Sequence, residues 1–296
     1  MSTEGLTVPT EAAGAISAGT GSARREVLHN LVRSKTFIVG GLIVAWWTLC
    51  AIAGYHIAPY TPFEQDLNSV NSAPSSTHWF GTDQIGRDVF SRVLAGARSV
   101  MVVSLAATVL GTVLGTILGL VTGYLRGWVD ESLGRLIDAF LALPVVVTAV
   151  LVVAALGPSD ITLVICIGLI FAPIIARTVR TAVIQERELD YITAARLRDE
   201  RGTYIMYAEL LPNVLPPILV EFTVRLGYAI FTVASLSFLG LGIQLPTPDW
   251  GLDISQNISV VSAGYWWEVL FAAAAIASLV IAINLVADAI AKAMDD

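Results

Sequence analysis

Six long apolar runs, separated by shorter polar stretches, dominate the sequence. A helix needs about 20 mostly apolar residues to cross the hydrocarbon core of a membrane. None of the six runs alternates polar and apolar residues as a half-buried strand would. The pattern therefore predicts an all-α integral membrane protein with six transmembrane helices, at residues 37–58, 99–125, 135–156, 161–176, 214–241 and 266–291.

The composition agrees with this class. Of the 296 residues, 55% are hydrophobic and 14% are charged, whereas a soluble domain carries about 25% charged residues. The net charge of −7 argues against a nucleic-acid partner, because proteins that bind nucleic acid usually have a basic face. Cys50 and Cys166 lie far apart inside apolar runs, so the sequence indicates no disulfide framework and no zinc site.

The basic residues predict the orientation of the chain in the membrane. Thirteen of the 17 lysines and arginines lie on one side, in the N-terminal stretch, around loops 126–135 and 177–201, and after the last run. Only three lie in the opposite loops. Because cytoplasmic loops carry an excess of Lys and Arg, both termini are predicted to be cytoplasmic.

The apolar runs divide the chain into three parts. Residues 1–36, rich in Gly, Ala, Ser and Thr, predict a flexible cytoplasmic tail. Residues 37–98 hold the first transmembrane helix and an external segment. Residues 99–291 form a core of five helices, in which the long loop 177–212 faces the cytoplasm.

The end of the external segment has a helical period. Thr82 or Asp83 is able to cap a helix, and apolar residues then recur every four positions from Ile85 to Ala97. Asp88 and Arg92 have the spacing of a stabilising ion pair on a helix. We expect an amphipathic helix on the outer membrane surface; an ordinary outer loop with a solvated charged face is the alternative.

The second run carries glycines at positions 111, 115, 119 and 123. A spacing of four places them on one face of a helix, where small residues let a neighbouring backbone approach closely in lipid. The sequence therefore predicts a close helix–helix contact along this face.

The cytoplasmic loop is more organised than a simple connection. Residues 177–211 hold 12 of the 41 charges, of both signs, with apolar residues between them. Gly202 allows a turn between two short helices. A loop this long usually has a task, so we expect a short helix that transmits the movement of a partner. The alternative is a solvated positive loop.

One pair of charges falls inside an apolar run. Glu221 and Arg225 lie one helical turn apart, acid first, and are therefore able to neutralise each other. Since charge in a membrane is costly and often functional, two interpretations stand. The pair faces another helix as a neutral unit, or it lines a path along which solute moves.

Motifs for catalysis are missing from the sequence. It contains no G-x-x-x-x-G-K-[ST] phosphate loop, no H-E-x-x-H and no G-x-S-x-G. His29, His56 and His78 are scattered along the chain and do not suggest a metal site. We therefore expect a protein that moves a solute, catalyses no reaction and holds no cofactor.

Several long strings resemble the peptide branch of bacterial ABC importers. The chain is similar over about residues 37–290 to the C-type membrane subunit of dipeptide and oligopeptide permeases. The strings are HWFGTDQIGRDVFSR at 78–92, GWVDE at 127–131, LALP at 141–144, SLSFLGLG at 235–242 and PTPDWG at 246–251.

This resemblance implies a fold, partners and a location. It implies the type I ABC importer permease fold in the bacterial plasma membrane, paired with a second, homologous permease subunit. Two cytoplasmic ATPases would bind ATP and magnesium, and an extracytoplasmic binding protein would deliver the peptide. The resemblance places toward that binding protein, as a hypothesis, Phe80, Gly81, Thr82, Asp83, Gly86, Arg87 and Asp88.

The family's coupling helix, which docks on the ATPase, aligns with the cytoplasmic loop. The matching positions are Tyr191, Thr193, Ala194, Ala195, Arg196, Asp199, Gly202, Leu211 and Pro212. Thr193 stands where the family has Glu, and Asp199 stands where it has Gly. We expect Gly202, three residues later, to supply the turn instead.

Other functions stay open from the sequence. Relatives with the same architecture import nickel, haem or another small solute. A stand-alone secondary transporter is a candidate from a different class, although the chain lacks an obvious inverted repeat. A hydrolase embedded in the membrane is the third alternative, and the sequence shows no nucleophile and base for it.

Overall fold

The computed structural model describes residue 31 and residues 33–295, and within this part of the chain nearly all regular structure is helical. An isolated bridge joins Thr82 and Asp88. The elements are α2 (Lys35–Ile57), α3 (Val89–Leu125), α4 (Gly127–Leu141), α5 (Val145–Leu156), α6 (Asp160–Glu186), α7 (Asp190–Leu197), α8 (Gly202–Tyr204), the π-helical turn η1 (Ile205–Leu210), α9 (Leu211–Phe238), α10 (Trp250–Asn257), the 3₁₀ segment η2 (Ile258–Ala263) and α11 (Trp267–Asp295).

Five helical stretches are long and apolar enough to cross a membrane: α2, α3, α6, α11, and the continuous stretch from α8 to α9. The sixth predicted span is broken into α4 and α5, which meet at an angle of 87°. Pro144 lies at this break as the N-cap of α5. Proline disfavours helical geometry in the residue before it, so the helix ends there. The prediction of an all-α membrane protein is confirmed, with the third span bent.

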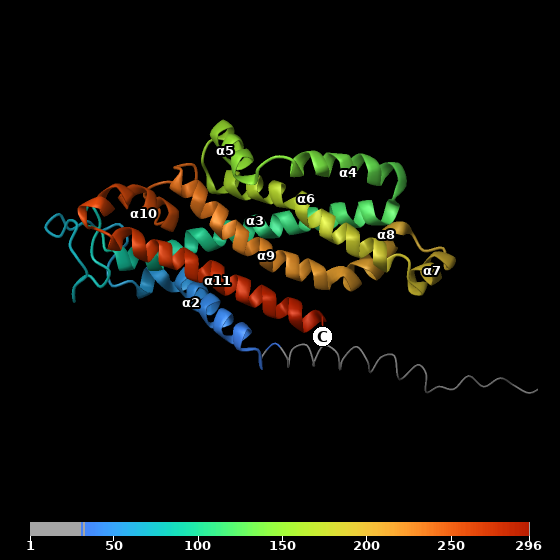
Figure 1. Ribbon diagram of the computed structural model, residues 1–296, viewed down its shortest axis with the longest axis horizontal. Coiled ribbons are helices and arrows are strands. Elements are labelled where there is room, and N and C mark those ends of the chain that lie inside the picture. Colours follow the sequence, from blue (N-terminus) through green and yellow to red (C-terminus); the bar gives the residue numbers. More distant parts are fainter. Residues whose placement is uncertain (1–30, 32, 296) are drawn as a thin grey trace, which may run out of the picture.

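The long helices lie side by side along the long axis of the molecule (Figure 1). The loop before α3 and the helix α10 lie at one end, and α7 lies at the other. The predicted tail, residues 1–36, falls mostly outside the described residues, and α2 begins at Lys35. The chain therefore has two ends of different character, each holding one of the predicted functional segments.

The prediction of an amphipathic helix on the outer membrane surface is wrong. Residues 82–88 form a turn, in which Gly86 has a φ of +78°, and Asp88 then caps α3 by accepting from the backbone N–H of Ser91. The following residues do not form a separate helix but the first turns of α3, and Val89, Val93 and Ala97 are buried. The predicted second span, 99–125, thus begins ten residues early.

The predicted glycine face is confirmed and holds α3 against α6. A Cβ atom at Gly115 would lie 2.7 Å from the carbonyl oxygen of Ala172. A Cβ at Gly119 would lie 2.6 Å from the Cβ of Val179. Both distances are shorter than atoms tolerate, so only glycine allows the two backbones to come this close. The pair α3–α6 is therefore the closely packed centre of the fold.

Candidate functional site

Two regions hold the predicted functional residues. The coupling segment, residues 190–212, lies at the α7 end of the molecule (Figure 1). The cap, residues 58–88 and 239–266, lies at the opposite end around α10. Between them, the ion pair of Glu221 and Arg225 lies on α9.

In the coupling segment, α7 is anchored by one face and exposed on the other. Ile192 and Ala195 are completely buried and belong to the main hydrophobic core. Thr193, Ala194 and Arg196 are exposed. The structure thus brings Tyr191 and residues 193–196 of the predicted set onto one short helix, but Ala195 anchors α7 and is not free to contact a partner.

The turn after α7 differs from the expectation. Asp199 has a φ of +57°, in the left-handed region that favours glycine. Gly202 is instead the first residue of α8, so the prediction that Gly202 replaces the family's glycine is wrong. Aspartate tolerates this conformation better than most residues because its short side chain bonds locally. The turn after α7 is therefore made at Asp199 itself.

Tyr191 ties α7 to the two long helices beside it. Its hydroxyl donates to Glu186 Oε2 at 2.8 Å, at the end of α6, and accepts from Asn213 Nδ2 at 3.2 Å, in the first turn of α9. Burial, together with the hydrogen bond to Glu186, raises the pKa of Tyr191 to about 12. Leu211 and Pro212 start α9, directly after the π-helical turn η1.

In the cap, most residues of the predicted external segment are buried. Thr82, Asp83, Arg87 and Asp88 are each at most 6% exposed, Gly81 and Gly86 are buried, and Phe80 is half-buried. These residues therefore give the cap its shape and contribute little to its exposed surface. Within residues 78–88 the exposed side chains are those of Trp79 and Ile85.

The ion pairs of the cap differ from the predicted one. Asp83 Oδ2 accepts from Arg87 Nε at 2.5 Å, while Asp88 pairs with His78. Arg92 pairs with Asp253 of α10, so the predicted pair of Asp88 and Arg92 is wrong. Sequence spacing did not reveal this contact because Asp253 is 161 residues away. The pair fastens the start of α3 to α10 inside the cap.

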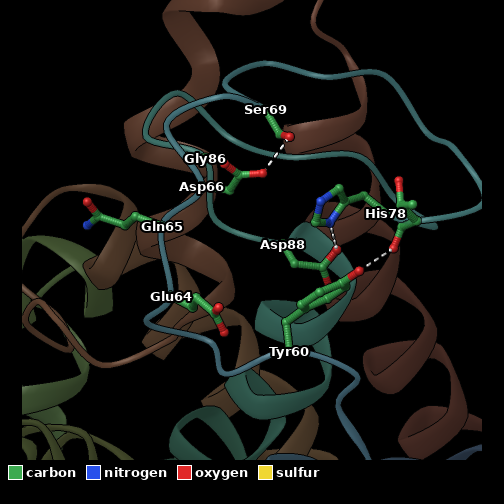
Figure 2. A pocket seen from close by; sticks show the side chains of 9 residues that line it. Tyr60, Glu64, Gln65, Asp66, Ser69, His78, Gly86 and Asp88 are labelled. Atoms are coloured by element: carbon green, nitrogen blue, oxygen red, sulfur yellow. Dashed lines mark hydrogen bonds and ion pairs between the residues drawn. The ribbon is translucent and has the colours of Figure 1, made fainter.

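A polar cleft of about 440 Å³ opens on the cap, lined by Tyr60, Glu64, Gln65, Asp66, Ser69, Thr77, His78, Gly86 and Asp88. Figure 2 shows His78 and Asp88 pointing toward each other, with 2.9 Å between Nδ1 and Oδ1. Ser91 Oγ donates to the same carboxylate and not to the imidazole. A hydrolase needs the serine on the imidazole, so these three residues do not form a catalytic triad.

Asp249 is a buried acid at the start of α10. It caps that helix by accepting from the backbone N–H of Leu252 at 2.9 Å. Burial raises its pKa to about 7. Beside it, Trp250 Nε1 donates to the carbonyl of Val93, which holds α10 on α3.

The predicted ion pair on α9 is present. Arg225 Nε donates to Glu221 Oε1 at 2.6 Å, and the two side chains are 18% and 13% exposed. The guanidinium also lies over the ring of Tyr228, 5.2 Å from its centroid. Sequence reasoning missed this tyrosine, although it lies three residues after Arg225 on the same face.

Among the described residues no group of three or more His, Cys, Asp or Glu has the geometry of a metal site, and His29 lies outside them.

Comparison with known proteins gives two family matches. Residues 111–296 match the model of the binding-protein-dependent transport system inner membrane component. Residues 22–74 match the N-terminal transmembrane domain of oligopeptide transport permease C.

Individual relatives agree over nearly the whole chain. The dipeptide transport system permease protein DppC of Alkalihalophilus pseudofirmus is 37% identical over 92% of this chain and 89% of its own. The glutathione transport system permease protein GsiD of Salmonella typhimurium is 39% identical over the same shares. DppC of Escherichia coli is 38% identical over 92% of each chain.

Proposed function

This chain belongs to the family of inner membrane components of binding-protein-dependent transport systems, and we propose that it is the permease subunit of an ATP-driven importer of short peptides. The observation that carries the proposal is the coupling segment: an anchored eight-residue helix whose other face is exposed at one end of the bundle. The printed names of the relatives, dipeptide and glutathione permeases, support a peptide substrate.

The proposed assembly contains four further chains. A second, homologous permease subunit forms the other half of the pathway. Two cytoplasmic ATPases dock on the coupling segment and bind ATP and magnesium, while this chain is non-catalytic and holds no cofactor. An extracytoplasmic binding protein delivers the peptide to the cap. Both termini lie in the cytoplasm, as the distribution of basic residues indicates.

The proposed mechanism is a rigid-body movement that alternates access to a cavity between the two permease subunits. Closure of the ATPases moves α7, and its buried anchors, Ile192 and Ala195, pass the movement to the helices behind them. No covalent step on this chain is required.

We further propose that Glu221 and Arg225 line the path. A zwitterionic peptide carries an ammonium and a carboxylate, which these two side chains are able to meet in turn. Their partial exposure and their contact with Tyr228, which is 55% exposed, support an open face. Weak contacts suit a path, since the solute must also leave.

The test of this path replaces both residues by glutamine. Losing one hydrogen bond between the peptide and a charged side chain costs about 1.5 kcal/mol. This cost predicts a fall of at least about tenfold in peptide uptake. The matched control is Glu131→Gln with Arg135→Gln, an exposed pair on α4 with the same spacing and a 2.5 Å contact. Unchanged uptake in the α9 variant removes this pair from the path.

The assembly is tested by purifying the tagged chain in mild detergent and identifying the proteins that accompany it. The proposal expects a second six-helix permease and ATPases with G-x-x-x-x-G-K-[ST] motifs. A folded chain that is recovered alone and moves solute without ATP contradicts the proposal and favours a secondary transporter.

A further inference from the structure

Tyr124 lies in the last turn of α3, and two arginine side chains lie over its ring. The guanidinium carbon of Arg187, just after α6, lies 5.8 Å from the ring centroid. That of Arg196, in α7, lies 5.6 Å from the same centroid. Arginine within about 6 Å of an aromatic centroid is attracted by the ring's electron density. One ring thus connects the end of α6 with α7.

A third element packs on the same ring. A Cβ atom placed on Gly202, the first residue of α8, would lie 3.1 Å from Tyr124 Cε1. The start of α8 therefore touches the ring closely. Gly202 thus has a packing role here, which accounts for a glycine that does not make the turn.

The backbone of α3 is held at the same place. Arg187 Nη1 donates to the carbonyl oxygen of Tyr124 at 2.6 Å. One residue earlier, a Cβ on Gly123 would lie 2.7 Å from a methyl carbon of Val183, so α3 and α6 have no room to slide independently. The neighbouring Arg126 forms a more exposed ion pair with Glu188 at 3.5 Å.

The other end of α3 is fastened inside the cap. Arg92, in its first turn, pairs with Asp253 of α10 and also donates to the carbonyl of Pro62. Trp250 donates to the carbonyl of Val93. α3 is therefore one continuous helix of 37 residues with fixed contacts at both ends.

From this geometry we infer that Tyr124 is a positioning residue for energy coupling: its ring transmits the displacement of α7 into α3, and through α3 to the cap. The inference rests on the proposed docking of α7 to an ATPase. Because Arg196 of α7 and Arg187 at the end of α6 both lie over this ring, movement of α7 relative to α6 changes the environment of Tyr124 directly. Tyr124 also packs against the hydrophobic core to which Ile192 and Ala195 of α7 belong.

The test measures hydrogen exchange in the full importer, reconstituted in nanodiscs, with and without ATP. In the wild type, ATP is expected to change exchange in both α7, residues 190–197, and the end of α3, residues 118–126. Tyr124→Leu keeps an apolar side chain but removes the aromatic face. It is expected to leave the response of α7 intact and to reduce that of α3 by at least about fivefold, the lower end of typical coupling between sites.

Two further variants keep the test decisive. Tyr124→Phe retains the face of the ring and is expected to retain the response of α3. Arg187→Gln removes one cation and is expected to weaken the response even if the leucine variant does not assemble. The matched control is Tyr55→Leu, because Tyr55 lies in α2 outside the coupling segment, is 36% exposed and stacks on no cation among the described residues.

The outcomes separate this inference from the proposed function. A response of α3 in Tyr124→Leu or Arg187→Gln within twofold of the wild type overturns the role of Tyr124 and leaves docking intact. A wild-type α7 that does not respond to ATP overturns the proposed docking itself, and the inference with it. Loss of the α3 response with a preserved α7 response supports both.

Discussion

Replacing Gly119 by alanine tests the closely packed centre of the fold. The new Cβ would lie 2.6 Å from the Cβ of Val179 and 2.8 Å from the carbonyl oxygen of Ala176. Neither atom is the end of a flexible side chain, so α3 and α6 must move apart to admit the methyl group. Overpacking of this kind costs about 1–3 kcal/mol.

The control for this substitution is Gly41→Ala in α2. A Cβ there would meet no atom within 4 Å. Since alanine favours a helix over glycine by about 1 kcal/mol, the control is expected to be neutral or slightly stabilising. Both glycines lie within long apolar helices, so the pair isolates packing from helix propensity.

The assay is thermal unfolding of the purified protein in a mild detergent, followed by loss of helical circular dichroism and by aggregation. Gly119→Ala is expected to unfold at a lower temperature than the wild type, and Gly41→Ala at the same temperature or higher. A Gly119→Ala protein as stable as the wild type contradicts the close contact of α3 with α6.

Two further predictions concern stability outside the membrane spans. Asp199 has a φ of +57°, so Asp199→Gly is expected to raise the free energy of unfolding by up to about 1 kcal/mol, and Asp199→Ala is expected to lower it. Chemical denaturation measures both changes. Equal stability of the two variants excludes the left-handed turn. Burial raises the pKa of Asp249 to about 7, above the value of about 3.9 in an unfolded chain. The folded protein therefore binds this proton more tightly, and its stability is expected to fall as the pH rises from about 4 to 7. Asp249→Asn, which keeps an N-cap residue, is expected to remove this part of the pH dependence in melting curves; an unchanged curve contradicts the burial of the carboxylate.

The membrane class and the glycine contact were predictable from the sequence because both follow from local periodicity. Runs of about 20 apolar residues identify spans, and a spacing of four identifies one face of a helix. The start of α3 was not predictable in this way. Residues 82–97 have an apolar period that fits a helix, but whether its charged face meets water or other charges depends on the rest of the fold.

The ion pairs show the same limit. Arg92 has Asp88 at the favourable spacing, yet its partner is Asp253, which α10 brings from the far end of the chain. The pair Glu221–Arg225 was predictable because both residues lie on one helix. For the turn after α7, the absence of glycine at position 199 suggested Gly202, whereas the structure places aspartate in the left-handed conformation. The ring of Tyr124 carried no signal in the sequence, since its partners come from three other segments.

The central proposal, ATP-driven import of short peptides, is tested most directly by transport in proteoliposomes. The complete assembly is reconstituted with its binding protein and offered a radiolabelled dipeptide, with ATP and magnesium on the ATPase side. Uptake that requires ATP and persists without any ion gradient is the result we expect. Uptake that follows a proton or sodium gradient and ignores ATP contradicts the account.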